Sequence, residues 1–178
     1  MPVWLIFAVG LCVGQEVDVY VVDRAAVSPA LMHRATAQAS ELLKAAGVRM
    51  TWKSGRPPEE ARGCPAIAVT IEKDAPPDLK AEVRGQTRLN DGSVTVFYDR
   101  IRPALSTWPS LAPTLLAQVL AHEIGHSLQG VNRHSDRGTM KAYWGLADYR
   151  AMQERQLSFS ATDARLMRAG IERCNPAE

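Results

Sequence analysis

The sequence places two histidines four positions apart, His122 and His126, with Glu123 directly after the first. Residues four apart lie on the same face of an α-helix, so both imidazoles can bind one metal ion. Glu123 is rotated away from that pair but lies beside it, where its carboxylate can hold a metal-bound water without becoming a ligand. A catalytic zinc ion takes three protein ligands and keeps a fourth position open. The pattern therefore predicts a zinc site that needs one further ligand.

His134 is the candidate for this third ligand, and Gly130 explains how the chain can bring it back. Glycine adopts the left-handed conformation that ends many helices because it has no Cβ atom. A helix that carries both motif histidines can therefore end at Gln129 and turn sharply, which brings His134 within reach of the metal. A carboxylate from the following part of the chain is the alternative ligand, and the sequence offers Asp136, Asp148 and Glu154.

The segment from residue 122 to residue 140 reads HExxHxxxGxxxH and closes on Met140. It resembles the metzincin clan of zinc endopeptidases, whose signature is HExxHxxGxxH followed by a turn that contains a methionine. The present sequence has one extra residue before the glycine and one more before the last histidine. The resemblance implies a zinc site of three histidines, with a turn around Met140 beneath it.

Tyr143 follows Met140 by three positions. Some metzincins carry a tyrosine two positions after this methionine, where it approaches the zinc ion or the oxyanion of the transition state. The resemblance makes Tyr143 a candidate for the same catalytic role. Packing in the hydrophobic core is the alternative, and it is the one that we expect.

The resemblance also implies a fold and a reaction. The fold is α+β, with a twisted mixed β-sheet packed on a long N-terminal helix and on the HExxH helix, and a short helical C-terminal part. The activity is that of a zinc metalloendopeptidase with a peptide or protein substrate. Zinc lowers the pKa of a bound water to about 7. Glu123 would take the proton of that water as it attacks the peptide carbonyl, and would pass it to the leaving amine.

Two other functions use the same residues. The first is a catalytically silent, metzincin-derived binding module that keeps zinc for structure or for recognition of a partner. The second is a toxin or effector with one narrow protein target. Glu123 favours the enzyme, because a purely structural zinc site has no use for a base.

Periodicity and punctuation residues predict the elements that position this site. Ser28 and Pro29 are typical of a helix start, and Pro113 is tolerated only in a first helical turn. We expect strands at 17–22, 48–53, 66–72, 85–89 and 93–98, and helices at 29–46, 112–129, 148–156 and 162–169, the last ended by Gly170. The strand at 85–89 is a candidate for a sheet edge on the upper rim of a substrate cleft, with an ordinary surface hairpin as the alternative.

Composition narrows the class of protein. A length of 178 residues favours one domain, from residue 15 to residue 178. A net charge of +2 gives no reason to expect nucleic acid as a partner. The sequence does not indicate an oligomeric state.

The N-terminus and the cysteines predict export. The apolar run at 3–13 has the length of a signal peptide and is too short to span a bilayer, so we expect residues 1–14 to be removed. A buried first strand is the alternative. The mature chain would then have no membrane segment and would be secreted or periplasmic. It would keep Cys64 and Cys174, an even count that suggests one disulfide, with two buried free thiols as the alternative.

Overall fold

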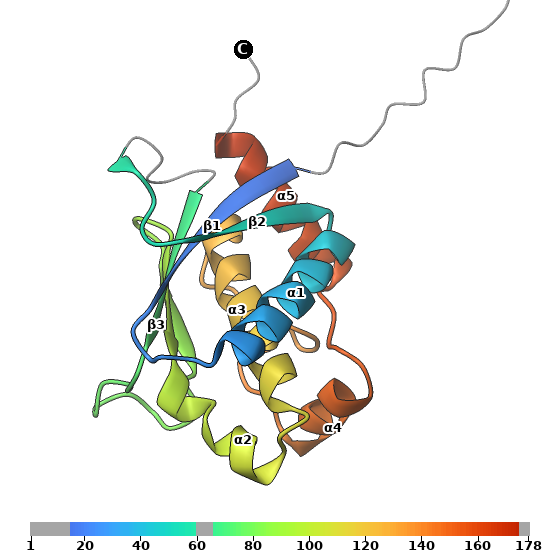
Figure 1. Ribbon diagram of the computed structural model, residues 1–178. Helices are drawn as coiled ribbons and strands as arrows, with labels where there is room; N and C mark the ends of the chain where they lie inside the picture. Colours follow the sequence, from blue (N-terminus) through green and yellow to red (C-terminus); the bar gives the residue numbers. More distant parts are fainter. Residues whose placement is uncertain (1–14, 60–65, 175–178) are drawn as a thin grey trace, which may run out of the picture.

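The computed structural model describes residues 15–59 and 66–174, which form a five-stranded sheet with helices packed against it (Figure 1). The strand order is β2-β1-β3-β5-β4, and every neighbouring pair is parallel except β4 with β5. The sheet is therefore mixed, as predicted, with its one antiparallel strand at an edge. The strands are β1 (Gln15–Asp23), β2 (Val48–Ser54), β3 (Ala66–Glu72), β4 (Gly85–Arg88) and β5 (Ser93–Phe97).

The helices lie on one side of this sheet (Figure 1). The first, α1, joins β1 to its parallel neighbour β2, a connection that a tight turn cannot make. Its start agrees with the sequence prediction, because the Ser28 hydroxyl accepts a hydrogen bond from the Leu31 amide and Pro29 occupies the first helical position. The helices are α1 (Pro29–Ala45), α2 (Pro103–Thr107), α3 (Ala112–Gln129), α4 (Leu146–Glu154) and α5 (Ala161–Cys174), with a short 3₁₀ turn η2 (Tyr98–Arg100).

Helix α3 carries the HExxH motif and runs through the middle of the molecule. It contacts α1, α5 and the strands β4 and β5. Four apolar residues at a spacing of four, Leu116, Leu120, Ile124 and Leu128, are buried, and nearly every other residue of the helix is buried as well. A helix that is enclosed on all sides has little freedom to shift. The core therefore fixes the direction in which the motif histidines point.

The C-terminal helix departs from the sequence prediction. We expected Gly170 to end it, but α5 continues to Cys174 and Gly170 lies inside it. A Cβ atom at Gly170 would overlap the backbone carbonyl of Leu128. Gly170 thus allows α5 to approach the end of α3 closely, and helix packing rather than helix termination accounts for this glycine.

Some predictions fall wholly or partly outside the described part of the chain. The expected signal peptide at 1–14 does, as does Cys64, whereas Cys174 is described and is disulfide-bonded. The pairing of Cys64 with Cys174 stays a prediction. Within residues 15–59 and 66–174, no helix is long and apolar enough to cross a membrane.

Candidate metal centre

Three histidines from two segments converge at the C-terminal half of α3. The Nε2 atom of His126 lies 3.1 Å from that of His122 and 3.3 Å from that of His134. Adjacent ligands of a tetrahedral zinc ion with Zn–N bonds of 2.0–2.1 Å are about 3.3 Å apart. These two distances fit ligands of one zinc ion, and all three ligand atoms lie within 4.8 Å of one another. The described residues form no other group of three or more metal-binding side chains.

Backbone carbonyls orient two of the three rings. The Nδ1 atom of His122 lies 2.8 Å from the carbonyl oxygen of Thr139, and that of His126 lies 3.1 Å from the carbonyl of Val131. A carbonyl can only accept, so each neutral ring carries its proton on Nδ1 and leaves a lone pair on Nε2. Lone pairs that face each other at this distance repel unless a cation lies between them. The donor set thus has the chemistry that a metal requires.

Burial keeps these rings neutral. It lowers the pKa of His122 to about 4 and also lowers the pKa of His126 and of His134. The neighbouring imidazoles add to the effect at His122 and His126, because each would repel a second positive charge. A histidine must be neutral to bind a metal. The pocket therefore presents binding-competent imidazoles at neutral pH.

The turn after α3 has the predicted geometry. Gly130 adopts the left-handed conformation, with φ at 68°, and its amide donates to the carbonyl of His126. The chain then returns. Relative to the metzincin signature, one additional residue lies at the end of α3, before Gly130, and the other lies in the turn between Gly130 and His134. His134 reaches the other two histidines, whereas the alternative ligands Asp136, Asp148 and Glu154 are not members of the metal-binding group.

A buried carboxylate that we did not single out from the sequence holds the loop of His134 in place. Asp163, at the start of α5, is completely buried. One of its oxygens accepts from Arg133 and from Ser135, each at 2.7 Å. The other accepts from the amide of Ser160 at 2.9 Å and from its hydroxyl at 2.6 Å. The residues on both sides of His134 are thereby tied to α5.

This carboxylate is ionised. Burial alone would raise the pKa of Asp163, but the hydrogen bonds from Ser160, Ser135 and Arg133 together lower it below its ordinary value. Ser160 and Asp163 stand at the spacing of a capping box, with a hydroxyl at the helix start and an acid three residues on. That sequence signal marks a helix start, and nothing in it indicates that the same carboxylate also reaches Arg133 and Ser135.

Glu123 lies beside the histidines and is held from β4. One carboxylate oxygen accepts a hydrogen bond of 2.7 Å from the hydroxyl of Thr87, which also lies 2.9 Å from the Glu123 carbonyl. A Cβ atom at Gly85 would come within 2.7 Å of the Glu123 Cγ atom, so that glycine makes room for the side chain. Burial raises the pKa of Glu123 to about 7, although the bond from Thr87 lowers it.

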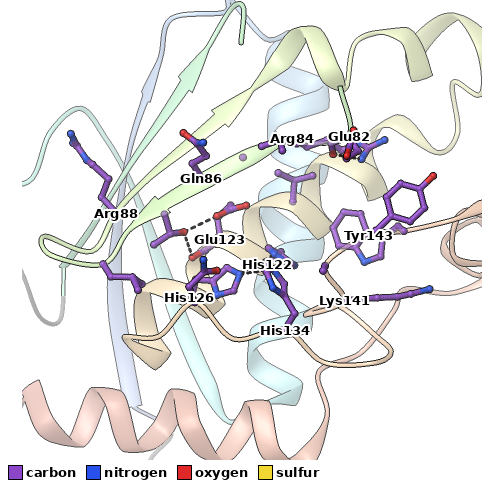
Figure 2. A pocket seen from close by; sticks show the side chains of 18 residues that line it. Glu82, Arg84, Gln86, Arg88, His122, Glu123, His126, His134, Lys141 and Tyr143 are labelled. Atoms are coloured by element: carbon purple, nitrogen blue, oxygen red, sulfur yellow. Dashed lines mark hydrogen bonds between the residues drawn. The ribbon is translucent and has the colours of Figure 1, made fainter. Parts of the chain in front are cut away.

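These side chains line a pocket of about 410 Å³ (Figure 2). One wall is β4, which confirms the predicted position of this strand at a sheet edge and places it along the pocket. The opposite wall is the segment 141–144, which follows Met140. Gln86 and Arg88 of β4, which also line this pocket, are exposed to solvent.

Tyr143 and Met140 lie in different surroundings, because Tyr143 is exposed and Met140 is buried. Tyr143 is 60% exposed, so core packing was the wrong expectation, and Figure 2 shows its hydroxyl at the pocket rim, directed away from the histidines. Its neighbour Trp144 is the buried aromatic residue, and it packs edge-on against His122 with ring centroids 5.6 Å apart. Met140 is fully buried, and its sulfur would lie 2.7 Å from a Cβ atom at Gly125. The glycine at position 125 of α3 leaves room for the side chain of Met140.

Comparison with known proteins adds a fold resemblance. No protein-family model matches the sequence, and no curated protein sequence does. The fold is similar to the crystal structure of archaemetzincin from Methanopyrus kandleri, with a TM-score of 0.54 over 89% of this chain and 96% of that chain. The two sequences are 19% identical, so the comparison concerns the fold alone. At that level it supports the metzincin-like fold that the motif predicted.

Proposed function

We propose that this protein is a zinc-dependent metallopeptidase. The observation that carries the proposal is the convergence of three neutral Nε2 atoms beside the buried carboxylate of Glu123. A structural zinc site is closed by four protein ligands, whereas a catalytic site leaves one position for water or substrate. Three histidines with an acid at the open side match the second arrangement.

The protein groups have defined tasks in this reaction. Zinc, when bound by His122, His126 and His134, would supply a Lewis acid that polarises the scissile carbonyl. Glu123 is the proton carrier: a carboxylate whose pKa is about 7 can accept a proton near neutral pH and release it to the leaving amine. Thr87 keeps that carboxylate in place with a hydrogen bond of 2.7 Å.

The substrate class follows from β4. It is the last strand of the sheet and pairs only with β5 within the described residues, so its outer edge offers free backbone groups. An extended peptide can add to such an edge as a further strand, which orients its backbone along the pocket. We therefore propose peptide or protein substrates, and no direct contact of Tyr143 with the reacting atoms.

Export remains part of the proposal. It rests on the apolar run at 3–13, and the disulfide at Cys174 supports it because disulfides persist in oxidising compartments.

Zinc content and peptide cleavage test the proposal together. We expect one zinc per chain in the wild type, its loss in His134→Ala and its retention in the matched control Asp136→Ala. Glu123→Gln should keep zinc and lose peptide cleavage, since the amide keeps the shape of the side chain but cannot take up a proton. A Glu123→Gln variant that cleaves peptides at the wild-type rate would refute the role of the base. Zinc without cleavage in the wild type would instead support the binding module.

A further inference from the structure

One cation of the pocket has no counter-ion. Lys141 forms an ion pair of 2.6 Å with Asp148, and Arg88, whose side chain is 73% exposed, lies 3.5 Å from Asp91. Arg84 also lines the pocket, but no carboxylate of the described residues lies within ion-pair distance of it. An unpaired guanidinium in a partly enclosed site favours binding of an anion.

Neighbouring groups hold the side chain of Arg84 in place. Its Nη1 atom donates to the backbone carbonyl of Glu82 at 2.9 Å, and its Cζ atom lies 5.6 Å from the ring centroid of Tyr149. Its Nε atom is buried and has no hydrogen-bond partner among the described residues. A guanidinium that is already fixed loses less conformational entropy when it binds a ligand. Arg84 is therefore fixed in position, and its positive charge remains available for an anionic partner such as a carboxylate.

The direction of β4 places Arg84 relative to the cleaved bond. Antiparallel pairing is slightly more stable than parallel pairing, so a bound peptide would run from Arg88 towards Arg84. Glu123 contacts β4 at Gly85 and Thr87, between these two arginines. Figure 2 shows Arg88 at one end of the pocket and Arg84 with Tyr143 at the other. Arg84 thus lies on the side of the residues that follow the scissile bond.

We infer that Arg84 forms a subsite that binds a substrate carboxylate within the first two residues after the cleaved bond. This inference rests on the proposed peptidase function and specifies its substrates. The carboxylate can come from an aspartate or glutamate side chain or from the C-terminus of a short peptide. The exposed carboxylate of Glu82 lines the same end of the pocket and opposes this binding.

Peptide binding tests the subsite separately from catalysis. The zinc-loaded Glu123→Gln variant is titrated against fluorescent peptides that carry Asp or Asn at the first or second position after the bond, each with a free or an amidated C-terminus. Fluorescence anisotropy gives the dissociation constants. We expect the favoured carboxylate peptide to bind about 10-fold more tightly than its amide counterpart. A charge-assisted hydrogen bond contributes at least the binding free energy that corresponds to this ratio of dissociation constants.

Three substitutions, each added to Glu123→Gln, show whether Arg84 causes the preference. Arg84→Gln should reduce the ratio to about one, while the matched control Arg88→Gln should leave it unchanged. Glu82→Gln should increase it, and this variant does not disturb the packing of Arg84 on Tyr149. Zinc content and circular dichroism confirm that each variant is folded. The position and terminus that show the ratio identify the source of the carboxylate.

The outcomes separate the two proposals. Equal binding of carboxylate and amide peptides, no binding of either, or a preference that survives Arg84→Gln would overturn the subsite. Cleavage of the same peptides by the wild type is measured in parallel by mass spectrometry. A charge preference without cleavage refutes the peptidase function and leaves the subsite standing, whereas cleavage without a charge preference does the reverse.

Discussion

Replacement of Asp163 by asparagine tests whether the loop of His134 is held from outside the metal site. The carboxylate of Asp163 accepts four hydrogen bonds, and their donors belong to Arg133, Ser135 and Ser160. An asparagine side chain keeps one oxygen and turns an amide group towards the other donors. The substitution therefore keeps the shape of the side chain and removes half of its capacity to accept.

The magnitude follows from the bonds that are lost. Two of the four hydrogen bonds lose their acceptor, and each bond to a charged group contributes about 1.5–3 kcal/mol. The side chain of Arg133 is 40% exposed and can be rehydrated, which reduces the loss. We expect a decrease of about 3 kcal/mol in the free energy of unfolding, or a Tm lower by about 6–12 °C for a domain of this size. Zinc affinity should fall by about 10-fold or more, as when a partner of a metal ligand is removed.

Urea unfolding in the presence of a chelator measures the stability, and competition with a chromophoric chelator measures the zinc affinity. Asp136→Asn is the matched control, because Asp136 is exposed and lies on the same loop. It should change neither quantity. A wild-type zinc affinity in Asp163→Asn would refute the reasoning, whatever the change in stability, since the loop would then hold His134 without help from α5.

Two further substitutions address Glu123 from β4. Gly85→Ala introduces a Cβ atom 2.7 Å from the Glu123 Cγ atom, so the carboxylate must move; we expect kcat/KM to fall by about 100-fold with zinc content unchanged, and an unchanged rate would show that the position of Glu123 is not critical. Thr87→Val removes the hydrogen bond that lowers the pKa of Glu123, so that pKa should rise further above about 7. Since the base acts when deprotonated, the acid limb of the pH–activity profile should move to higher pH, and an unshifted limb would contradict the assignment of Glu123.

Local signals allowed much of the fold to be predicted from the sequence. The cap at Ser28 and Pro29 and the left-handed Gly130 depend on residues within a few positions, and the structure has them as expected. The spacing of His122 and His126 fixes their common face on a helix in the same way. His134 follows soon after the glycine that turns the chain. For the two caps and the two motif histidines, a short stretch of sequence contains the physical cause, whereas the loop that carries His134 is also held by the distant Asp163.

The remainder of the site depends on contacts between distant segments. Thr87 reaches Glu123 across 36 positions, and Asp163 reaches Arg133 across 30. No periodicity connects such pairs. Gly170 was misread for the same reason: a glycine near a helix end signals termination locally, whereas here it admits the carbonyl of Leu128 from another helix. Tyr143 was expected in the core, but its aromatic neighbour Trp144 takes that place, and the choice between the two depends on which of them faces His122.

The free edge of β4 also bears on how the protein avoids self-association. An unpaired strand edge can template the addition of a second copy and so lead to aggregation. β4 has only four residues, and antiparallel pairing of two copies about Gln86 would set Arg84 of one opposite Arg88 of the other. Like charges directly opposite across two strands are destabilising. The strand that can accept a foreign peptide therefore disfavours pairing with β4 of a second copy, and an open binding edge becomes compatible with solubility.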